Sequence, residues 1–181
     1  GLDKPLPVQI MNYVWGIVTD FDFGPSFRYK DRSVNDLIAG GFPVTLKYGF
    51  WSFLVAVTVG VTLGVIAALR HNTWADYAAV GVAITGQVLP NFVMAPILVL
   101  IFTVWLGVLP GGGWEGGQIQ FMIMPIIALS TSYFASIARI TRSSMLEVLN
   151  SNFIRTAKAK GLPSSYIIWK HALKPASLPV L

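Results

Sequence analysis

The chain has 181 residues, of which 54% are hydrophobic and only 12% charged, with a formal net charge of +5. A soluble domain usually carries about twice that charged fraction, and here long runs contain almost no charge, which is typical of membrane spans. The absence of cysteine excludes a disulfide scaffold, thiolate zinc sites and cysteine nucleophiles. Composition therefore predicts an all-α, polytopic membrane protein.

Residues 1–42 are polar and rich in turn-forming residues, and we expect a small surface layer there. Pro7 can open a short helix that ends near Asp20. Residues 33–36 have the spacing of a capping box for a second short helix. We expect the glycine pair at residues 40–41 to end that helix.

The first predicted span covers residues 44–69, in which Lys47 is the only charge. Roughly 20 apolar residues suffice to cross the hydrocarbon core, and a lysine near one end can extend its ammonium to the interface. Small residues recur here at every fourth position. Such a stripe allows the backbones of neighbouring helices to approach closely, and it consists of Ser52, Ala56, Gly60, Gly64 and Ala68.

A second uncharged stretch covers residues 77–106 and contains Pro90 and Pro96. Each proline removes a backbone hydrogen bond, so we expect a kinked or broken helix. The third span begins near residue 121, reaches the membrane end near 137 and continues as a helix to about 149. Residues 43–181 would then form the membrane core.

The charge distribution predicts the orientation. Residues 139–174 carry seven Lys and Arg against one Glu, whereas residues 1–42 carry four basic and five acidic side chains. Because Lys and Arg collect on the cytoplasmic side, we expect residues 70–76 and 150–174 inside the cell. Residues 1–42 and the glycine-rich loop at 107–118 would lie outside.

Two polar side chains interrupt the second stretch. Gln87 and Asn91 are four residues apart, so on a helix they would share one face, with Pro90 between them. Polar side chains are costly in lipid, so both should point at other helices or at a polar cavity. They could line a translocation path, or they could hold the bundle together by interhelical hydrogen bonds, and the residues alone leave both open.

The motifs of catalysis and metal binding are missing from the sequence. There is no Walker-type phosphate loop. His71 and His171 lie far apart and fit surface or interface positions better than a metal site. Residues 20–22 lack the remaining acids of a calcium loop. We expect no catalytic residue, metal or cofactor in this chain.

Two functions common among membrane proteins, secondary transport and intramembrane hydrolysis, fit the sequence poorly. A secondary transporter would usually carry intramembrane acids or histidines, and between Tyr77 and Ile137 the only such residue is Glu115 in the loop. An intramembrane hydrolase would need a histidine or aspartate within a span to activate a serine. The available serines are Ser130, Ser132 and Ser136.

Residues 150–174 form a basic elbow with two short predicted helices. Asn150 or Ser151 can cap the first helix, and Gly161 can end it in the left-handed conformation. Phe153, Ile154 and Ala157 lie on one side of this helix, and basic residues decorate the others: Arg155, Lys158 and Lys160. The helix could lie on anionic lipid or insert its apolar side into a groove of a soluble partner.

A resemblance distinguishes these alternatives. The elbow fits the spacing of the EAA loop, by which ABC importer permeases dock their ATPases, with matches at Ala157, Gly161 and Leu173. The form RTAKAKGL…HALKP is similar to the peptide-importer branch, as are FDFGPSFRYKDRSVNDL, LPGGGW and IARITRSSMLEVL. Along essentially its whole length the chain resembles permeases of the oligopeptide and dipeptide branch, most of all their B-type subunits.

This resemblance implies a type I (MetI-like) permease fold and a role as one subunit of an ATP-driven peptide importer in the bacterial inner membrane. The implied partners are a second homologous permease, two cytoplasmic ATPases that bind ATP and magnesium, a periplasmic peptide-binding protein, membrane lipid and the peptide itself, but not nucleic acid. It also implies that the chain is truncated, with one helix before it and two after the elbow. The cargo could instead be dipeptides, nickel or antimicrobial peptides. The implied ATPase-coupling residues are Asn152, Phe153, Ile154, Arg155, Ala157, Lys158, Gly161 and Leu162.

Overall fold

The computed structural model describes residues 4–180, and the chain divides into two compact units, Gly1–Lys47 and Tyr48–Leu181. Within the described residues, regular structure is helical, and the one bridge between extended residues joins Pro25 and Ser33. The predicted all-α class is confirmed.

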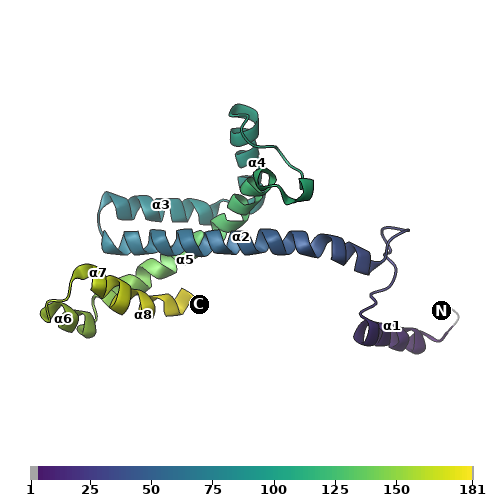
Figure 1. Cartoon of the computed structure of the whole chain (residues 1–181), viewed down its shortest axis with the longest axis horizontal. Coiled ribbons are helices and arrows are strands. Elements are labelled where there is room, and N and C mark those ends of the chain that lie inside the picture. The colour runs from purple at the N-terminus through teal and green to yellow at the C-terminus, as the bar shows by residue number, and fades with distance from the viewer. Residues whose placement is uncertain (1–3, 181) are drawn as a thin grey trace. The chain divides into compact units, whose positions relative to one another are not determined.

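The first unit contains α1, Leu6–Asp20, with the predicted proline in its first turn (Figure 1). The helix ends at Phe21, whose φ of 52° lies in the left-handed region. Asn35 fixes the following turn, because its amide donates to the Phe21 carbonyl at 2.6 Å and its side-chain oxygen accepts the Phe23 N–H at 2.9 Å. None of the residues of α1 is buried.

The helix α2 runs without interruption over Val34–Leu69. The predicted capping box is confirmed, since the backbone N–H groups of Ser33 and Asp36 each donate to the other residue's side chain at 3.1 Å. The prediction that Gly40 and Gly41 end this helix is wrong. A glycine costs a helix only about 1 kcal/mol, which is too little to end a helix that has already been nucleated at the capping box. The helix therefore continues, with Pro43 inside it.

The second predicted span is divided into α3, Trp74–Val88, and α4, Asn91–Val99, which is followed by a π-helical segment η1, Leu100–Trp105. The two parts are bent by 106°. Leu89 is extended and Pro90 precedes the first residue of α4, so the predicted break is confirmed at Pro90. Pro96 lies inside α4 and does not end it.

After the 3₁₀ turn η2, Glu115–Gly117, the long helix α5 covers Ile119–Leu149. By length and composition, α2 and α5 could each cross a membrane, and α3 with α4 could form a third, bent span.

The predicted small-residue stripe is confirmed as the contact face of α2, because all five of its members are buried. The stripe faces α5. A Cβ added to Gly60 would lie 2.7 Å from the Cβ of Ile137, and one added to Gly64 would lie 2.6 Å from the carbonyl oxygen of Ala138. A neighbouring face of α5 packs against α3 around a cluster formed by Ala83, Ala135 and Ala138, and Leu63 of α2 packs against the same cluster.

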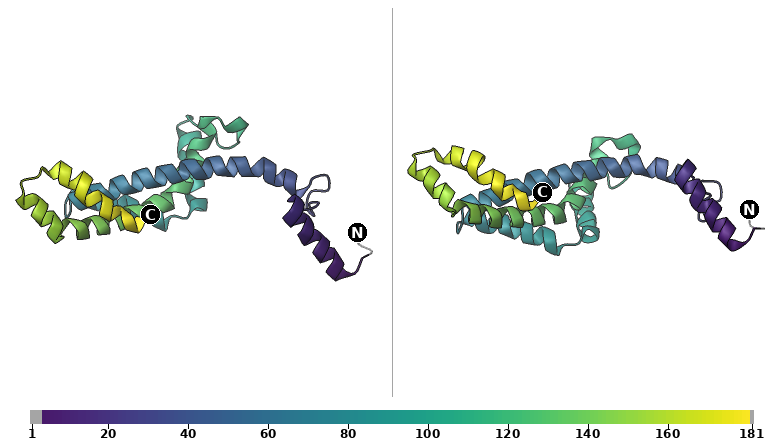
Figure 2. Two further views of the ribbon diagram at one scale, coloured as in Figure 1. Left: turned by 60° about the horizontal axis from the view of Figure 1, so that its bottom comes forward. Right: turned by 90° about the horizontal axis from the view of Figure 1, so that it is seen from below.

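The chain then folds back on itself (Figures 1 and 2). The elbow contains α6, Asn152–Ala159, and α7, Ser164–Tyr166, which leads through the π-helical segment η3, Ile167–Ala172, into α8, Leu173–Ser177, and the 3₁₀ turn η4, Leu178–Val180. As a result α8 lies beside the end of α5 in both views. Ile167 and Ala172 are five residues apart and both buried. That spacing is the i→i+5 hydrogen-bond spacing of the π-helix.

Candidate functional site

The elbow helix α6 has an inner face fastened to the chain's own core. Ile154 is 0% exposed and Ala157 is also buried. They pack in one apolar cluster with residues of α2, α5, η3 and α8, namely Ala68, Met145, Ile167, Ala172 and Ala176. Two of the predicted coupling residues, Ile154 and Ala157, therefore contact the chain's own core, and their role in coupling stays a prediction. The chain folds back after α6 and covers that side itself.

The outer face of α6 carries one large apolar side chain among polar and basic ones. Phe153 is 49% exposed, although it neighbours the fully buried Ile154. Around it lie the exposed Asn152, Arg155 and Lys158. The elbow thus presents an aromatic side chain within a positively charged surface, a combination that can bind an apolar pocket with an acidic rim.

Gly161 ends α6 as predicted, with a φ of 75°. Its N–H donates to the Lys158 carbonyl at 3.0 Å, and the Leu162 N–H donates to the Ala157 carbonyl at 3.4 Å. These two bonds form a Schellman motif, and Leu162 packs against the core cluster that contains Ala157.

Ser151 occupies the cap position at the start of α6, but its side chain does not cap the helix. Its hydroxyl donates instead to the carbonyl of Val148 at 2.6 Å, while the Asn150 amide donates to the Leu146 carbonyl at 2.9 Å. Both side chains therefore bond to the last turn of α5. The predicted side-chain cap is wrong, because both side chains donate instead to carbonyls at the nearby end of α5.

The basic surface continues into η3. The ammonium of Lys170 lies 5.1 Å from the ring centroid of Tyr166. A hydrogen bond with the Tyr166 side chain raises the pKa of Lys170 above its usual value.

Gln87 and Asn91 do not share a helix face, contrary to the prediction, because the chain breaks between them at Pro90. Each is bonded to α5. The guanidinium of Arg139 donates to the Gln87 side-chain oxygen, and the Ser132 hydroxyl donates to the Asn91 side-chain oxygen at 3.0 Å. Interhelical bonding is thus present at both positions, and the path-lining role stays a prediction.

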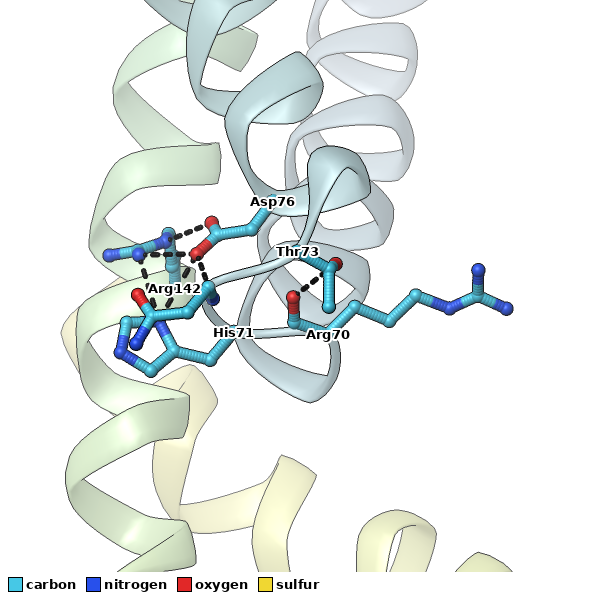
Figure 3. Close-up of polar contacts among 6 residues, drawn as sticks. Arg70, His71, Thr73, Asp76 and Arg142 are labelled. Carbon is cyan, nitrogen blue, oxygen red and sulfur yellow. Dashed lines mark hydrogen bonds and ion pairs between the residues drawn. The ribbon is translucent and has the colours of Figure 1, made fainter.

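A charged cluster that the sequence analysis missed joins the α2–α3 turn to α5 (Figure 3). Asp76 is 1% exposed. Its two carboxylate oxygens accept from Nε and Nη2 of Arg142 at 2.7 and 2.8 Å, and one of them also accepts from the Asn72 N–H at 3.0 Å. The Nδ1 atom of His71 lies 3.1 Å from both the carboxylate and Nη2 of Arg142.

The Asp76–Arg142 pair is bidentate, which is the stronger and more directional geometry for these two groups. The signal for it was present in the sequence. An acid opens one apolar stretch, and an arginine stands near the end of another stretch that runs in the opposite direction. The sequence analysis used Arg142 only to orient the chain and gave Asp76 no role.

Comparison with known proteins identifies the family. Residues 60–181, more than half of the chain, match the model of the binding-protein-dependent transport system inner membrane component. The chain belongs to this family. The matched residues include α3, α5 and the whole elbow, so the Asp76–Arg142 pair and α6 lie within the region that defines it.

Relatives within the family support the resemblance found in the motifs. The chain is 59% identical over 180 residues to the oligopeptide transport system permease protein OppB of Salmonella typhimurium, and equally to that of Escherichia coli. It is 47% identical to the dipeptide transport system permease protein DppB of Bacillus subtilis. Each match covers 99% of this chain but 58% of the relative. The predicted family is confirmed, and the chain spans somewhat more than half of these proteins.

Proposed function

We propose that the chain is the greater part of a permease subunit in an ATP-driven peptide importer, with oligopeptides as the cargo. The observation that carries the proposal is the elbow, in which α6 is fixed to the core by Ile154 and presents Phe153 outward among basic side chains. The names of the relatives with 59% identity support oligopeptides. The relative from Bacillus subtilis makes dipeptides the second candidate.

The subunit would work with a second homologous permease, two ATPases that bind ATP and magnesium, and a binding protein that delivers peptide. The distribution of Lys and Arg supports a cytoplasmic position for residues 70–76 and 150–174, and a periplasmic position for residues 1–42 and 107–118. The elbow then faces the ATPases, whereas the glycine-rich loop faces the binding protein.

The contacts of the elbow suggest how movement is transmitted. A partner that binds Phe153 would move α6, and because Ile154 packs with Met145 the displacement would reach α5. The bidentate Asp76–Arg142 pair would carry it from α5 to α3. The chain would contribute mechanical coupling, while its ATPase partners hydrolyse ATP.

Peptide uptake tests the proposal as a whole. Cells that lack their own importer would receive the full-length gene with those of its neighbouring subunits, and uptake of a labelled tri- to pentapeptide would be followed with and without ATP depletion. We expect uptake that requires both this subunit and ATP. A correctly inserted and assembled complex that takes up no peptide would contradict the proposal.

The coupling role is tested by two neighbouring substitutions with different expected results. Phe153→Ala removes an exposed side chain, so we expect a stable, assembled subunit whose transport falls at least tenfold. Ile154→Ala empties a fully buried site and should destabilise the protein by about 2–5 kcal/mol. Phe27→Ala, which makes the same change at an exposed phenylalanine outside the elbow, serves as the control. Normal transport by the Phe153→Ala variant would contradict the role.

A further inference from the structure

A groove of about 240 Å³ lies between α2, α3 and α5. Four alanines, Ala79, Ala83, Ala135 and Ala138, form much of its wall, and Gln87 and Arg139 also line it. All four alanines are buried, whereas Gln87 and Arg139 are exposed. The groove therefore combines a narrow apolar wall with one amide and one guanidinium that are accessible from outside.

The positive charge of Arg139 is not neutralised within the described chain. The carboxylate of Asp76 is bound to Arg142, and no ion pair with Arg139 is found among residues 4–180. Arg139 donates to the side-chain oxygen of Gln87, which carries no net charge. An uncompensated guanidinium at a helix that crosses a membrane is costly unless water or an anion reaches it.

The direction of the Arg139 side chain bears on which anion could reach it. Asp76, at the start of α3, binds Arg142, whereas Gln87, which binds Arg139, lies near the other end of α3. At 1.5 Å per residue the two positions on α3 are roughly 16 Å apart. The guanidinium of Arg139 is therefore drawn away from the basic end of α5, where the headgroups of the cytoplasmic leaflet are expected. This direction disfavours a lipid phosphate and favours an anion that enters from a polar path.

We propose that Arg139, oriented by Gln87, binds the C-terminal carboxylate of a peptide as it passes through the permease. A guanidinium forms two parallel hydrogen bonds with a carboxylate, and every unmodified linear peptide carries that group. The alanine wall leaves space for the adjoining main chain without selecting a side chain. This inference rests on the proposed function, to which it adds the part of the cargo that is recognised within the membrane.

The test compares two forms of one peptide in the complete importer reconstituted in proteoliposomes. One form is a labelled pentapeptide with a free C-terminal carboxylate, and the other is its C-terminal amide. The ratio of their ATP-dependent uptake rates is measured for the wild type and for Arg139→Gln. Because the binding protein is the same in both, its own preference cancels when the two ratios are compared. We expect Arg139→Gln to lower the acid-to-amide ratio about tenfold, and Arg139→Lys to lower it less.

Arg70→Gln is the matched control, since it removes an exposed positive charge outside the groove and should leave the ratio unchanged. Three results would overturn the inference. Equal loss of both peptides, which leaves the ratio unchanged, would make Arg139 a structural partner of Gln87 only, and wild-type uptake of both forms would exclude contact with the carboxylate. An effect that depends on anionic lipid, but not on the peptide terminus, would assign Arg139 to a lipid headgroup. The proposed function fails separately, if the wild type takes up neither form.

Discussion

The two sides of α5 are held by different kinds of contact. On one side α2 lies against it through glycine, alanine and serine, so closely that Gly64 has no room for a Cβ. Even the buried hydroxyls of Ser52 and Thr141 have no hydrogen-bond partner in the described structure. On an adjacent side, where Leu63 of α2 also packs, α3 is joined to α5 by Asp76–Arg142 and Gln87–Arg139. Lipid provides no hydrophobic force between helices, so the first contact depends on shape, whereas the second adds paired polar groups to the packing of small residues.

The largest loss of stability is expected where a charged side chain would lose its partner. Asp76→Ala leaves Arg142 without its carboxylate in a largely buried site, which typically costs about 3–5 kcal/mol. The folded fraction and thermal unfolding of the full-length protein in detergent would measure the loss. The double variant Asp76→Leu with Arg142→Met should recover most of it, since no unpaired charge then remains. A loss of less than about 1 kcal/mol in Asp76→Ala would show that the pair is not needed to hold α3.

A single methyl group tests the contact that depends on shape. In Gly64→Ala the new Cβ would lie 2.6 Å from the backbone oxygen of Ala138, which cannot rotate away. We expect a destabilisation of about 1–3 kcal/mol by the same unfolding measurement. Gly81→Ala in α3 is the control, because nothing lies within 4 Å of its added Cβ. Equal stability of the two variants would mean that α2 and α5 can separate without cost.

At Gly161 the backbone conformation, rather than packing or a polar contact, limits which residue can be accepted. No atom lies within 4 Å of an added Cβ, but the φ of 75° penalises any residue that has one. Gly161→Val should cost about 1–2 kcal/mol locally, so that transport falls while membrane insertion persists. Gly161→Asn should cost less, because asparagine tolerates this conformation better. Unchanged transport by the valine variant would argue against a coupling role for the turn.

The smallest loss of stability is expected at the hydrogen bond between Ser132 and Asn91, which joins two neutral side chains. Interhelical hydrogen bonds in membranes average about 0.6 kcal/mol, so Ser132→Ala and Asn91→Leu should each reduce stability only slightly. A double-mutant cycle on unfolding would measure the coupling between them. If Asn91→Leu or Gln87→Leu changes transport of a stably folded protein, these residues line the path, whereas loss of folded protein would assign them to the bundle alone.

The sequence predicted those features that depend on local pattern. The stripe of α2, the break at Pro90 and the left-handed turn at Gly161 all follow from residue types at fixed spacings. The continuation of α2 through Gly40 and Gly41 could not be predicted from propensity, because a penalty of about 1 kcal/mol per glycine is too small to end a helix that has already been nucleated.

The contacts that sequence analysis missed join residues far apart in the chain. Asp76 and Arg142 are separated by most of α3, all of α4 and much of α5, and only the antiparallel packing of α3 against α5 brings them together. The burial of Ile154 likewise depends on the chain folding back after α6. An amphipathic pattern indicates that one side of a helix will be covered, but it does not say whether a partner or the same chain covers it.

The π-helical turn at Ile167–Ala172 determines how this region can vary in length. If one exposed residue such as Trp169 were deleted, the turn could relax to an ordinary α-helix, and its two buried ends would then be four residues apart. Four residues span one α-helical turn, so both ends would still face the core. A deletion of one residue within α5 has no such remedy, because it would rotate one half of the helix by about 100° relative to the other. Natural chains of this family that differ by one residue should therefore carry the gap in η3.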